Sequence, residues 1–237
     1  MSETKRRDFL KNAGVVLGST AGIGAFSLSA VAQEGTAKKR EISRLNDDTA
    51  RKIIGINGSH RAGKTCAQSL GIVFEAIKAA DATLETELVE LATLNIGMPV
   101  VGGTQEPDDI DPLFEKIVDP GCVGLVIASP VYFGLPSARL VAMIDRLSPL
   151  RRTWALKNKI LGLVAVAGAR NGGQEVVLHS MISAFVAQQM ILAVDGAPTS
   201  HWGATMWNQQ DSVSADEFGT STAKNLGTRI AELAKLV

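Results

Sequence analysis

The chain has 237 residues, of which 46% are hydrophobic and 20% are charged, and its 24 basic residues balance its 24 acidic ones. This length and composition suit one globular domain that buries a sizeable core. Nucleic-acid binding needs a basic stripe with interleaved aromatic residues, and the sequence contains no such stripe. We therefore expect no nucleic-acid partner.

The N-terminal segment has the features of an export signal. Arg6 and Arg7 precede a Phe-Leu-Lys triplet, a weakly apolar run rich in Gly, Ala and Ser covers 13–28, and 30–32 is an A-x-A cleavage pattern. The segment resembles twin-arginine signals, so residues 1–32 are predicted to be a signal peptide that directs the protein to the periplasm or beyond. A frayed tail or a membrane anchor is the alternative. The run is short and Gly-rich for a spanning helix, and no stable span is expected after cleavage.

The remaining chain is predicted to be a linker, 33–50, followed by a domain over 51–237. The linker is polar and charged, whereas short apolar runs alternate with segments of helical spacing from Arg51 onward. The predicted strands are 52–57, 84–90, 123–128, 159–167 and 190–194. The predicted helices are 64–80, 109–118, 136–147, 174–188 and 215–236. The last three strands are nearly continuous in Val, Ile, Leu and Ala, as is typical of parallel strands covered on both faces.

This alternation predicts an α/β fold, a doubly wound five-stranded parallel sheet of order 2-1-3-4-5 with helices on both faces. Ligands of such folds bind at the carboxyl ends of the strands. The connections 91–107 and 195–214 are longer than ordinary loops, which favours a functional role. His201 and Trp202 in the second connection are candidates for a substrate lid or a subunit contact, with surface decoration as the alternative.

The stretch Gly-Ser-His-Arg-Ala-Gly-Lys-Thr at 58–65 matches the nucleotide-binding pattern G-x-x-x-x-G-K-[ST]. It lies between a predicted strand and a predicted helix, where free backbone N–H groups favour an anion such as phosphate. A nucleotide hydrolase also needs an acidic residue at a strand end to hold Mg²⁺. Of the three nearly continuous apolar strands, only the last offers one, Asp195, and at the edge of the sheet it lies too far from Thr65. A hydrolase is therefore the least favoured interpretation, and no metal site is predicted.

Two later stretches carry a resemblance to a known family. They are Ser-Pro-Val-Tyr-Phe-Gly at 129–134, with Met-Ile-Asp-Arg at 143–146, and Gly-Gly-Gln-Glu at 172–175. The chain resembles the flavodoxin-like NADPH-dependent FMN reductases, which include the iron-sulfur flavoproteins, over about 51–195. The resemblance implies a flavodoxin-like fold, FMN as cofactor, NAD(P)H as a possible donor, and a small acceptor such as a quinone or flavin. It also implies a homo-oligomer.

The same resemblance assigns the FMN contacts to three loops. The first loop would hold the phosphate, where Lys64 adds a cation that many relatives lack; the second would line the ring, and the third would lie along its pyrimidine side. Tyr132 is the candidate catalytic residue, because it would shape the acceptor site. The assigned residues are Ser59, Arg61, Lys64 and Thr65 in the first loop, Pro130, Val131, Tyr132, Phe133 and Gly134 in the second, and Ala169, Arg170, Gly173, Gln174 and Glu175 in the third.

Several alternatives stay open at this stage. Bare backbone with aromatic walls suits a flavin ring, yet Tyr132 and Phe133 could instead pack on top of the sheet. Arg139 and Arg146 are expected to be solvated or paired with Asp145 and the acidic helices. The protein could also be an FMN electron carrier without enzymatic turnover.

The cysteines separate this chain from iron-sulfur flavoproteins. Those relatives carry a cysteine cluster after the second strand, whereas 91–107 has none and the whole chain has only Cys66 and Cys122. No iron-sulfur cluster is expected, since four thiolates are needed. A disulfide is not expected either, because the two residues fall at opposite ends of the sheet. We predict buried apolar thiols, with a lowered pKa of Cys66 near a helix N-terminus as the alternative.

Overall fold

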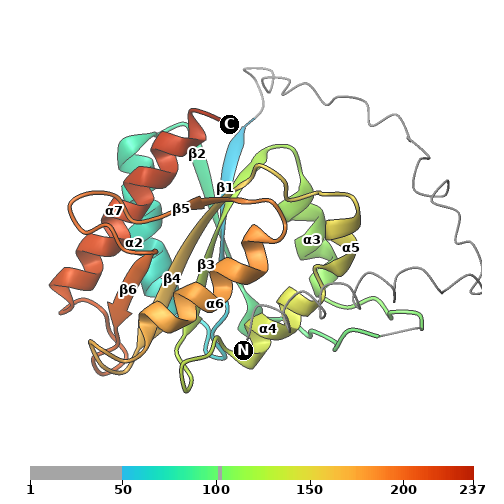
Figure 1. Cartoon of the computed structure of the whole chain (residues 1–237), viewed down its shortest axis with the longest axis horizontal. Helices are drawn as coiled ribbons and strands as arrows, with labels where there is room; N and C mark the ends of the chain where they lie inside the picture. The colour runs from blue at the N-terminus through green and yellow to red at the C-terminus, as the bar shows by residue number, and fades with distance from the viewer. Residues whose placement is uncertain (1–49, 101–102) are drawn as a thin grey trace, which may run out of the picture. The chain divides into compact units, whose positions relative to one another are not determined.

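A parallel sheet forms the centre of the computed structural model, which describes residues 50–100 and 103–237 (Figure 1). Its strands run in the order β2-β1-β3-β4-β5, as predicted. Their bounds are Arg51–Asn57 for β1, Leu84–Glu90 for β2, Cys122–Pro130 for β3, Ile160–Ala167 for β4 and Ile191–Ala193 for β5. The predicted signal peptide, and all of the predicted linker but residue 50, lie outside the described residues.

The edge of the sheet consists of two short strands rather than one. β5 pairs with the start of β4, and a sixth strand, β6 (Ala204–Trp207), pairs in parallel with the end of β4. The prediction of a loop throughout 195–214 was therefore wrong for the β6 residues. The chain leaves the sheet between β5 and β6. This interruption separates β6 from the apolar run of the sequence that contains β5.

Among the described residues, five α-helices and one short 3₁₀ turn connect the strands, and a sixth α-helix, α7, follows β6. Their bounds are Thr65–Ala80 for α2, Leu91–Thr93 for η2, Ile110–Val118 for α3, Ala138–Asp145 for α4, Ser148–Arg152 for α5, Gln174–Val186 for α6 and Glu217–Ala234 for α7. The predicted helix 136–147 is α4 alone, with α5 following it. Ser137 caps α4 by accepting a hydrogen bond from Leu140 N, and a proline in the first turn starts α5, where its missing N–H costs nothing.

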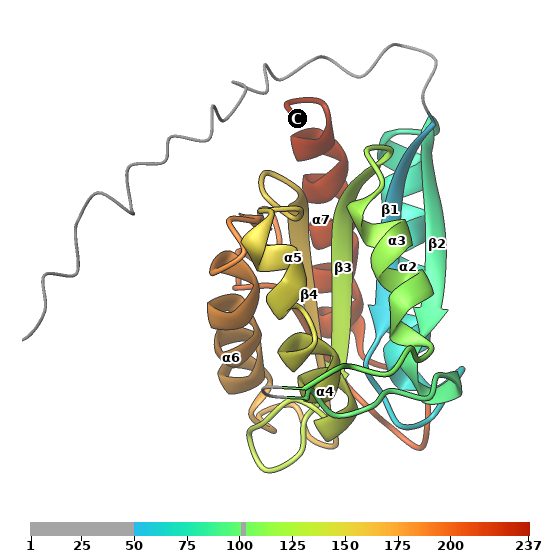
Figure 2. The same ribbon diagram turned by 90° about the vertical axis from the view of Figure 1, so that its right-hand side faces the viewer.

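The helices cover both faces of the sheet (Figure 2). α2 and α7 pack together on one face, whereas α3, α4 and α6 contribute to a core on the other. β4 shows why both cores form, because its residues alternate with the period of two that a strand imposes. Leu161, Leu163 and Ala165 belong to one core, and Ile160, Val164 and Val166 belong to the other.

The face that carries α2 and α7 depends on a close approach of the two helices at Gly227. A Cβ atom at this position would lie 2.4 Å from the carbonyl oxygen of Val73 and 2.7 Å from Cβ of Ala76. Because the nearest atom belongs to the backbone, a larger residue requires the helices to separate. Gly71, on α2 of the same pair, has no heavy atom within 4 Å of such a Cβ.

The Gly227→Ala substitution is expected to destabilise the protein by about 1–3 kcal/mol, because it overpacks the α2–α7 contact. The matched Gly71→Ala substitution is expected to be neutral or to stabilise by up to about 1 kcal/mol, since alanine is the better helix former and has open space there. Urea unfolding of the two variants measures both effects. Equal effects of the two substitutions would contradict this packing.

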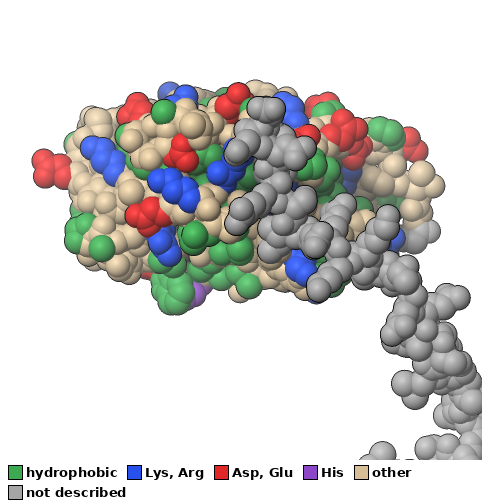
Figure 3. Space-filling view, turned by 90° about the horizontal axis from the view of Figure 1, so that it is seen from above, with side chains coloured by type: hydrophobic (Ala, Val, Ile, Leu, Met, Phe, Trp, Pro, Cys, Tyr) green, Lys and Arg blue, Asp and Glu red, His purple; other side chains and the backbone are tan. Residues whose placement is uncertain are grey.

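The end of the sheet where the strands begin has a mixed surface. On this face, basic and acidic side chains are interspersed among neutral ones rather than gathered by sign (Figure 3).

Within 50–100 and 103–237, no helix is both long and apolar enough to cross a membrane.

Candidate active site

Three loops meet where β1, β3 and β4 end. They cover 58–64, 131–137 and 168–173. The rings of His60 in the first loop and Tyr132 in the second are stacked with their centroids 5.8 Å apart. A Cβ at Gly173 of the third loop would lie 3.5 Å from Cγ1 of Val131 and 3.8 Å from Cα of Gly134. The structure therefore brings the three predicted segments together at one edge of the sheet.

The first loop is folded by its own polar side chains. The backbone N–H of Ser59 donates to Oδ1 of Asn57 over 2.9 Å, and the N–H of Arg61 donates to Oγ of Ser59 over 3.0 Å. These turns lead the chain into α2 at Thr65, and Lys64, at the N-cap, makes no side-chain capping hydrogen bond. The first amides of α2 and the positive end of its dipole thus form an anion-binding terminus.

Two carboxylates contact this loop. Asp211 pairs with Arg61 over 2.7 Å and with Lys64 over 3.5 Å, and Oε1 of Glu90 accepts a hydrogen bond from Gly63 N over 3.0 Å. The hydrogen bond from Arg61 lowers the pKa of the Asp211 carboxyl, and the charge of Lys64 adds to this effect. Neither carboxylate was predicted as a site residue, although the long connection 195–214 that contains Asp211 was singled out.

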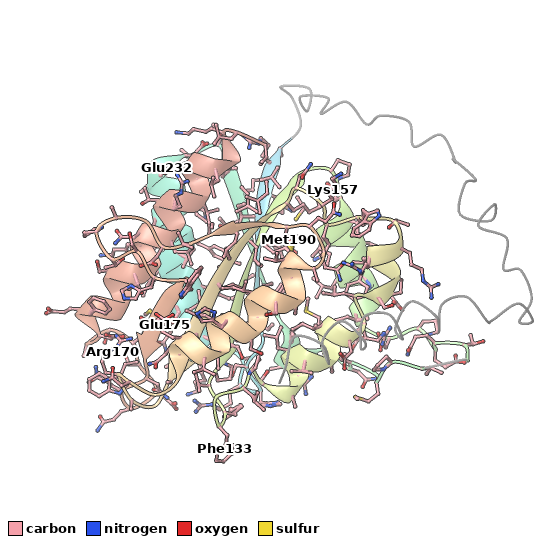
Figure 4. All side chains as sticks on the ribbon, in the orientation of Figure 1. Phe133, Lys157, Arg170, Glu175, Met190 and Glu232 are labelled. Atoms are coloured by element: carbon pink, nitrogen blue, oxygen red, sulfur yellow. The ribbon has the colours of Figure 1, made fainter. Side chains whose placement is uncertain are left out.

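The second loop ends in a tight exposed turn. Tyr132 and Leu135 exchange backbone hydrogen bonds of 3.0 and 2.9 Å, and the residues between them, Phe133 and Gly134, have φ values of 54° and 77°. A type I′ turn needs positive φ at both central positions. Phe133 is fully exposed at its tip (Figure 4), and Tyr132 is 43% exposed. The alternative that these aromatic residues pack on the sheet is therefore wrong.

The base of the second loop is fixed by hydrogen bonds. Pro130 ends β3, and the N–H of Val131 donates to the carbonyl oxygen of Val166 over 2.9 Å. Ser137 donates its hydroxyl to the carbonyl oxygen of Gly58, which links the second loop to the first. The turn is thereby held beside the first loop while its tip stays in solvent.

The third loop is held by the buried side chain of Gln174. Its Nε2 donates to the carbonyl oxygens of Ala169, over 2.8 Å, and Met206, over 3.1 Å, and its Oε1 accepts from Gly172 N over 2.9 Å. The side chain of Arg170 also has a protein partner, because it forms an ion pair with Asp216 over 2.7 Å. Because both side chains bind other protein groups, the groups that remain available to a ligand are the backbone of the loop and the N-terminus of α6.

A cavity of about 360 Å³ lies on the side of the third loop that faces β6 and α7. Arg170 and Glu175, which are labelled in Figure 4, line it. His201 lines it too, with Nδ1 3.4 Å from Oδ2 of the buried Asp195. The lining residues are Arg170, Asn171, Gly173, Gln174, Glu175, His201, Thr205 and Phe218.

Arg139 and Arg146 have structural partners. Arg139 donates to the carbonyl oxygens of Leu91 and Leu94, over 2.9 and 2.8 Å. Arg146 is buried and pairs with Asp108. The expected solvation and the expected pair with Asp145 were therefore wrong. The expected pairing with an acidic helix is confirmed for Arg146, whose Nη2 lies 3.6 Å from Oδ1 of Asp111 in α3.

The ion pair of Arg146 lies just before α3. Arg146 also donates to the carbonyl oxygen of Gly97 over 3.1 Å. Burial alone would raise the pKa of Asp108, but hydrogen bonds from Arg146 and from backbone amides outweigh it and lower the pKa. The pair ties the connection 91–107 to the end of α4, beside the candidate site.

Both cysteines are free and buried, as predicted. Burial raises the pKa of Cys66 to about 12, and burial likewise raises the pKa of Cys122. The alternative of a lowered pKa for Cys66 was wrong, because desolvation of the thiolate outweighs the favourable helix N-terminus.

Neither thiol of the folded protein is expected to react with a disulfide reagent at pH 8, since both are buried and protonated there. Unfolding in denaturant should expose both, giving two labelled thiols per chain. A colorimetric thiol assay with and without denaturant measures the difference. Rapid labelling of one thiol in the folded protein would contradict the burial of that residue.

Comparisons with known proteins identify the class. The fold matches the solved structure of a WrbA-like flavodoxin from Agrobacterium tumefaciens with a TM-score of 0.54 at 13% identity, covering 79% of this chain and 98% of that one. The chain thus has a flavodoxin-like fold. It is 37% identical to an iron-sulfur flavoprotein of Methanocaldococcus jannaschii over 78% of this chain and 98% of that protein. It is 31% identical to one of Methanosarcina thermophila over 78% and 96%.

The family model "NADPH-dependent FMN reductase" matches residues 51–203. The chain belongs to this family and is an FMN-dependent oxidoreductase. The residues at the loops fit this cofactor, because Arg61, Lys64 and the α2 terminus suit a phosphate. The exposed Tyr132 and the glycine-rich third loop suit a flat ring. Sequence reasoning missed His60, whose ring stacks on Tyr132; its only signal was its place within the first loop.

Proposed function

We propose that this protein binds FMN across the three loops and passes electrons from a small donor, NAD(P)H or a quinol, to a small acceptor such as a quinone or free flavin. The observation that carries the proposal is the meeting of an anion-binding helix terminus with an exposed aromatic turn in a member of this family. When bound, FMN supplies the redox chemistry. The chain itself supplies binding, orientation and access.

The first loop orients the cofactor through its phosphate. Arg61 and Lys64 provide charge-assisted hydrogen bonds, and the first amides of α2 add donors on a helix that is rigidly packed against α7. Ser59 is buried and fixes the backbone of the loop through Arg61 N, which keeps these donors in place. Thr65 begins α2 and is buried at the same terminus.

The second and third loops hold the ring and leave one side of it accessible. The backbone amides at the start of α6 offer donors to the oxygens of the pyrimidine ring, while Gln174 keeps that backbone in position. Tyr132 lies half exposed beside the second loop and shapes the space for donor and acceptor. The tip of the second loop is open to solvent, so the two substrates would occupy the same face in turn.

The test begins with the absorbance spectrum of the full chain and the identity of its heat-released chromophore, which should be FMN. Steady-state oxidation of NADPH or NADH with a quinone or ferricyanide then measures turnover. The Tyr132→Ala substitution is expected to lower kcat/KM for the acceptor about tenfold, with a smaller loss for Tyr132→Phe, which keeps the ring.

The other outcomes discriminate between functions. Stoichiometric reduction without turnover, with every donor and acceptor offered, would indicate an electron carrier instead of an enzyme. A folded protein that stays colourless in excess FMN and binds Mg²⁺-ATP would contradict the proposal and favour a nucleotide hydrolase. Light scattering of the same sample tests the proposed homo-oligomer.

We also propose that residues 1–32 export the folded chain by the twin-arginine route to the periplasm, on the strength of the Arg6-Arg7 pair and the A-x-A pattern that follows. Substitution of both arginines by lysine is expected to retain the full-length precursor in the cytoplasm, because the receptor reads that pair. Cell fractionation measures the shift. Export that is unaffected by this substitution would contradict the proposal.

A further inference from the structure

A short hairpin places an acidic residue on the first loop. Gln209 and Ser212 exchange backbone hydrogen bonds of 2.8 and 3.1 Å. The two residues between them, Gln210 and Asp211, have φ values of 53° and 63°. Both therefore lie in the left-handed region, which non-glycine residues enter at a cost, although aspartate tolerates it. The backbone of Asp211 is thus held at the tip of a turn.

The hairpin is attached to α2, the helix that begins at the first loop. Gln68 on α2 donates through Nε2 to the carbonyl oxygen of Asp211 over 3.1 Å and accepts at Oε1 from Val213 N over 3.3 Å. The N–H of Asp211 donates to Oδ1 of Asn208 over 2.9 Å. These backbone contacts position the Asp211 side chain without using its carboxylate. The carboxylate is therefore free to face Arg61 and Lys64, with which it pairs.

We propose that Asp211 is a specificity-determining residue of the cofactor site, whose carboxylate occupies the place between Arg61 and Lys64 that the phosphate of a flavin nucleotide must take. The inference rests on the proposed role of the first loop in binding FMN. Binding then exchanges one anion for another at the same two cations, and the carboxylate is displaced toward solvent. Asp211 is about half exposed, so the displacement requires no opening of the core.

The effect of this anion exchange on the affinity for a flavin depends on the charge of the flavin. A phosphate monoester carries about −1.5 to −2 charges near pH 7 and presents three acceptor oxygens, so it competes well with a carboxylate for two cations. The displaced carboxylate stays close and repels the phosphate, which weakens FMN binding. Riboflavin has no phosphate and needs no displacement. Asp211 therefore reduces the preference of the site for FMN over riboflavin and offsets the extra cation Lys64.

The experiment titrates the full chain with FMN and with riboflavin and follows flavin fluorescence. The isosteric Asp211→Asn substitution is expected to lower Kd for FMN about two- to fivefold, the range expected from exposed ion pairs. It should leave Kd for riboflavin unchanged within about twofold. In 1 M salt the gain should shrink, because exposed charges are screened. Asp81→Asn, at the other end of α2, is the matched control and should change neither Kd.

Two outcomes would overturn the inference while FMN still binds the wild type. Unchanged or weaker FMN binding by Asp211→Asn would mean that the carboxylate does not compete with phosphate. Equal tightening of FMN and riboflavin would mean that the substitution changes the fold of the loop rather than a charge at the phosphate. An Asp211→Ser variant must repeat the result of the asparagine variant. Failure of the wild type to bind either flavin would overturn the proposed function as well.

Discussion

The burial of β1, β3 and β4 on both faces is the constraint on which the site depends. Two apolar cores clamp these strands, one beneath α2 and α7 and one beneath α3, α4 and α6. Parallel strands held in this way end at the same edge, so the three loops that follow them must converge. The loops need little apolar surface of their own, and their polar side chains can fold the backbone instead. Asn57, Ser59 and Gln174 do this through hydrogen bonds to nearby amides and carbonyl groups.

Electrostatics at the first loop give the site its chemical character. Two cations and a helix N-terminus favour an anion there, yet two carboxylates, Asp211 and Glu90, also contact the loop. The loop is therefore not a simple positive pocket. Its affinity for a phosphate depends on the difference between its attraction for that phosphate and its attraction for the carboxylates already present. This balance distinguishes a phosphate monoester from an uncharged ligand.

Much of the fold follows from local sequence patterns, and part of the site does not. The strand order could be predicted because the apolar runs of β3 and β4 are nearly continuous and alternate with helical spacing. β6 was missed because a strand of four residues after an excursion has too little periodicity to stand out. The pair of Arg146 with Asp108 and the pair of Arg61 with Asp211 join residues far apart in the chain, so no local pattern marks them. The exposure of Phe133 could not be predicted either, because it follows from a tight turn with positive φ values that no local sequence pattern marks.

Hydrogen bonds from Arg139 and Arg146 hold the connection 91–107, which contains no cysteine, and the two cysteines of the chain are too few to ligate an iron-sulfur cluster. We propose that FMN is the single cofactor and that its phosphate lies at the first loop. The ³¹P NMR signal of FMN bound to the full chain tests this most directly. We expect a phosphate that stays dianionic from pH 5 to 8 and a resonance that moves in Arg61→Ala. A bound phosphate that titrates near pH 6 like the free ester, and ignores that substitution, would contradict it.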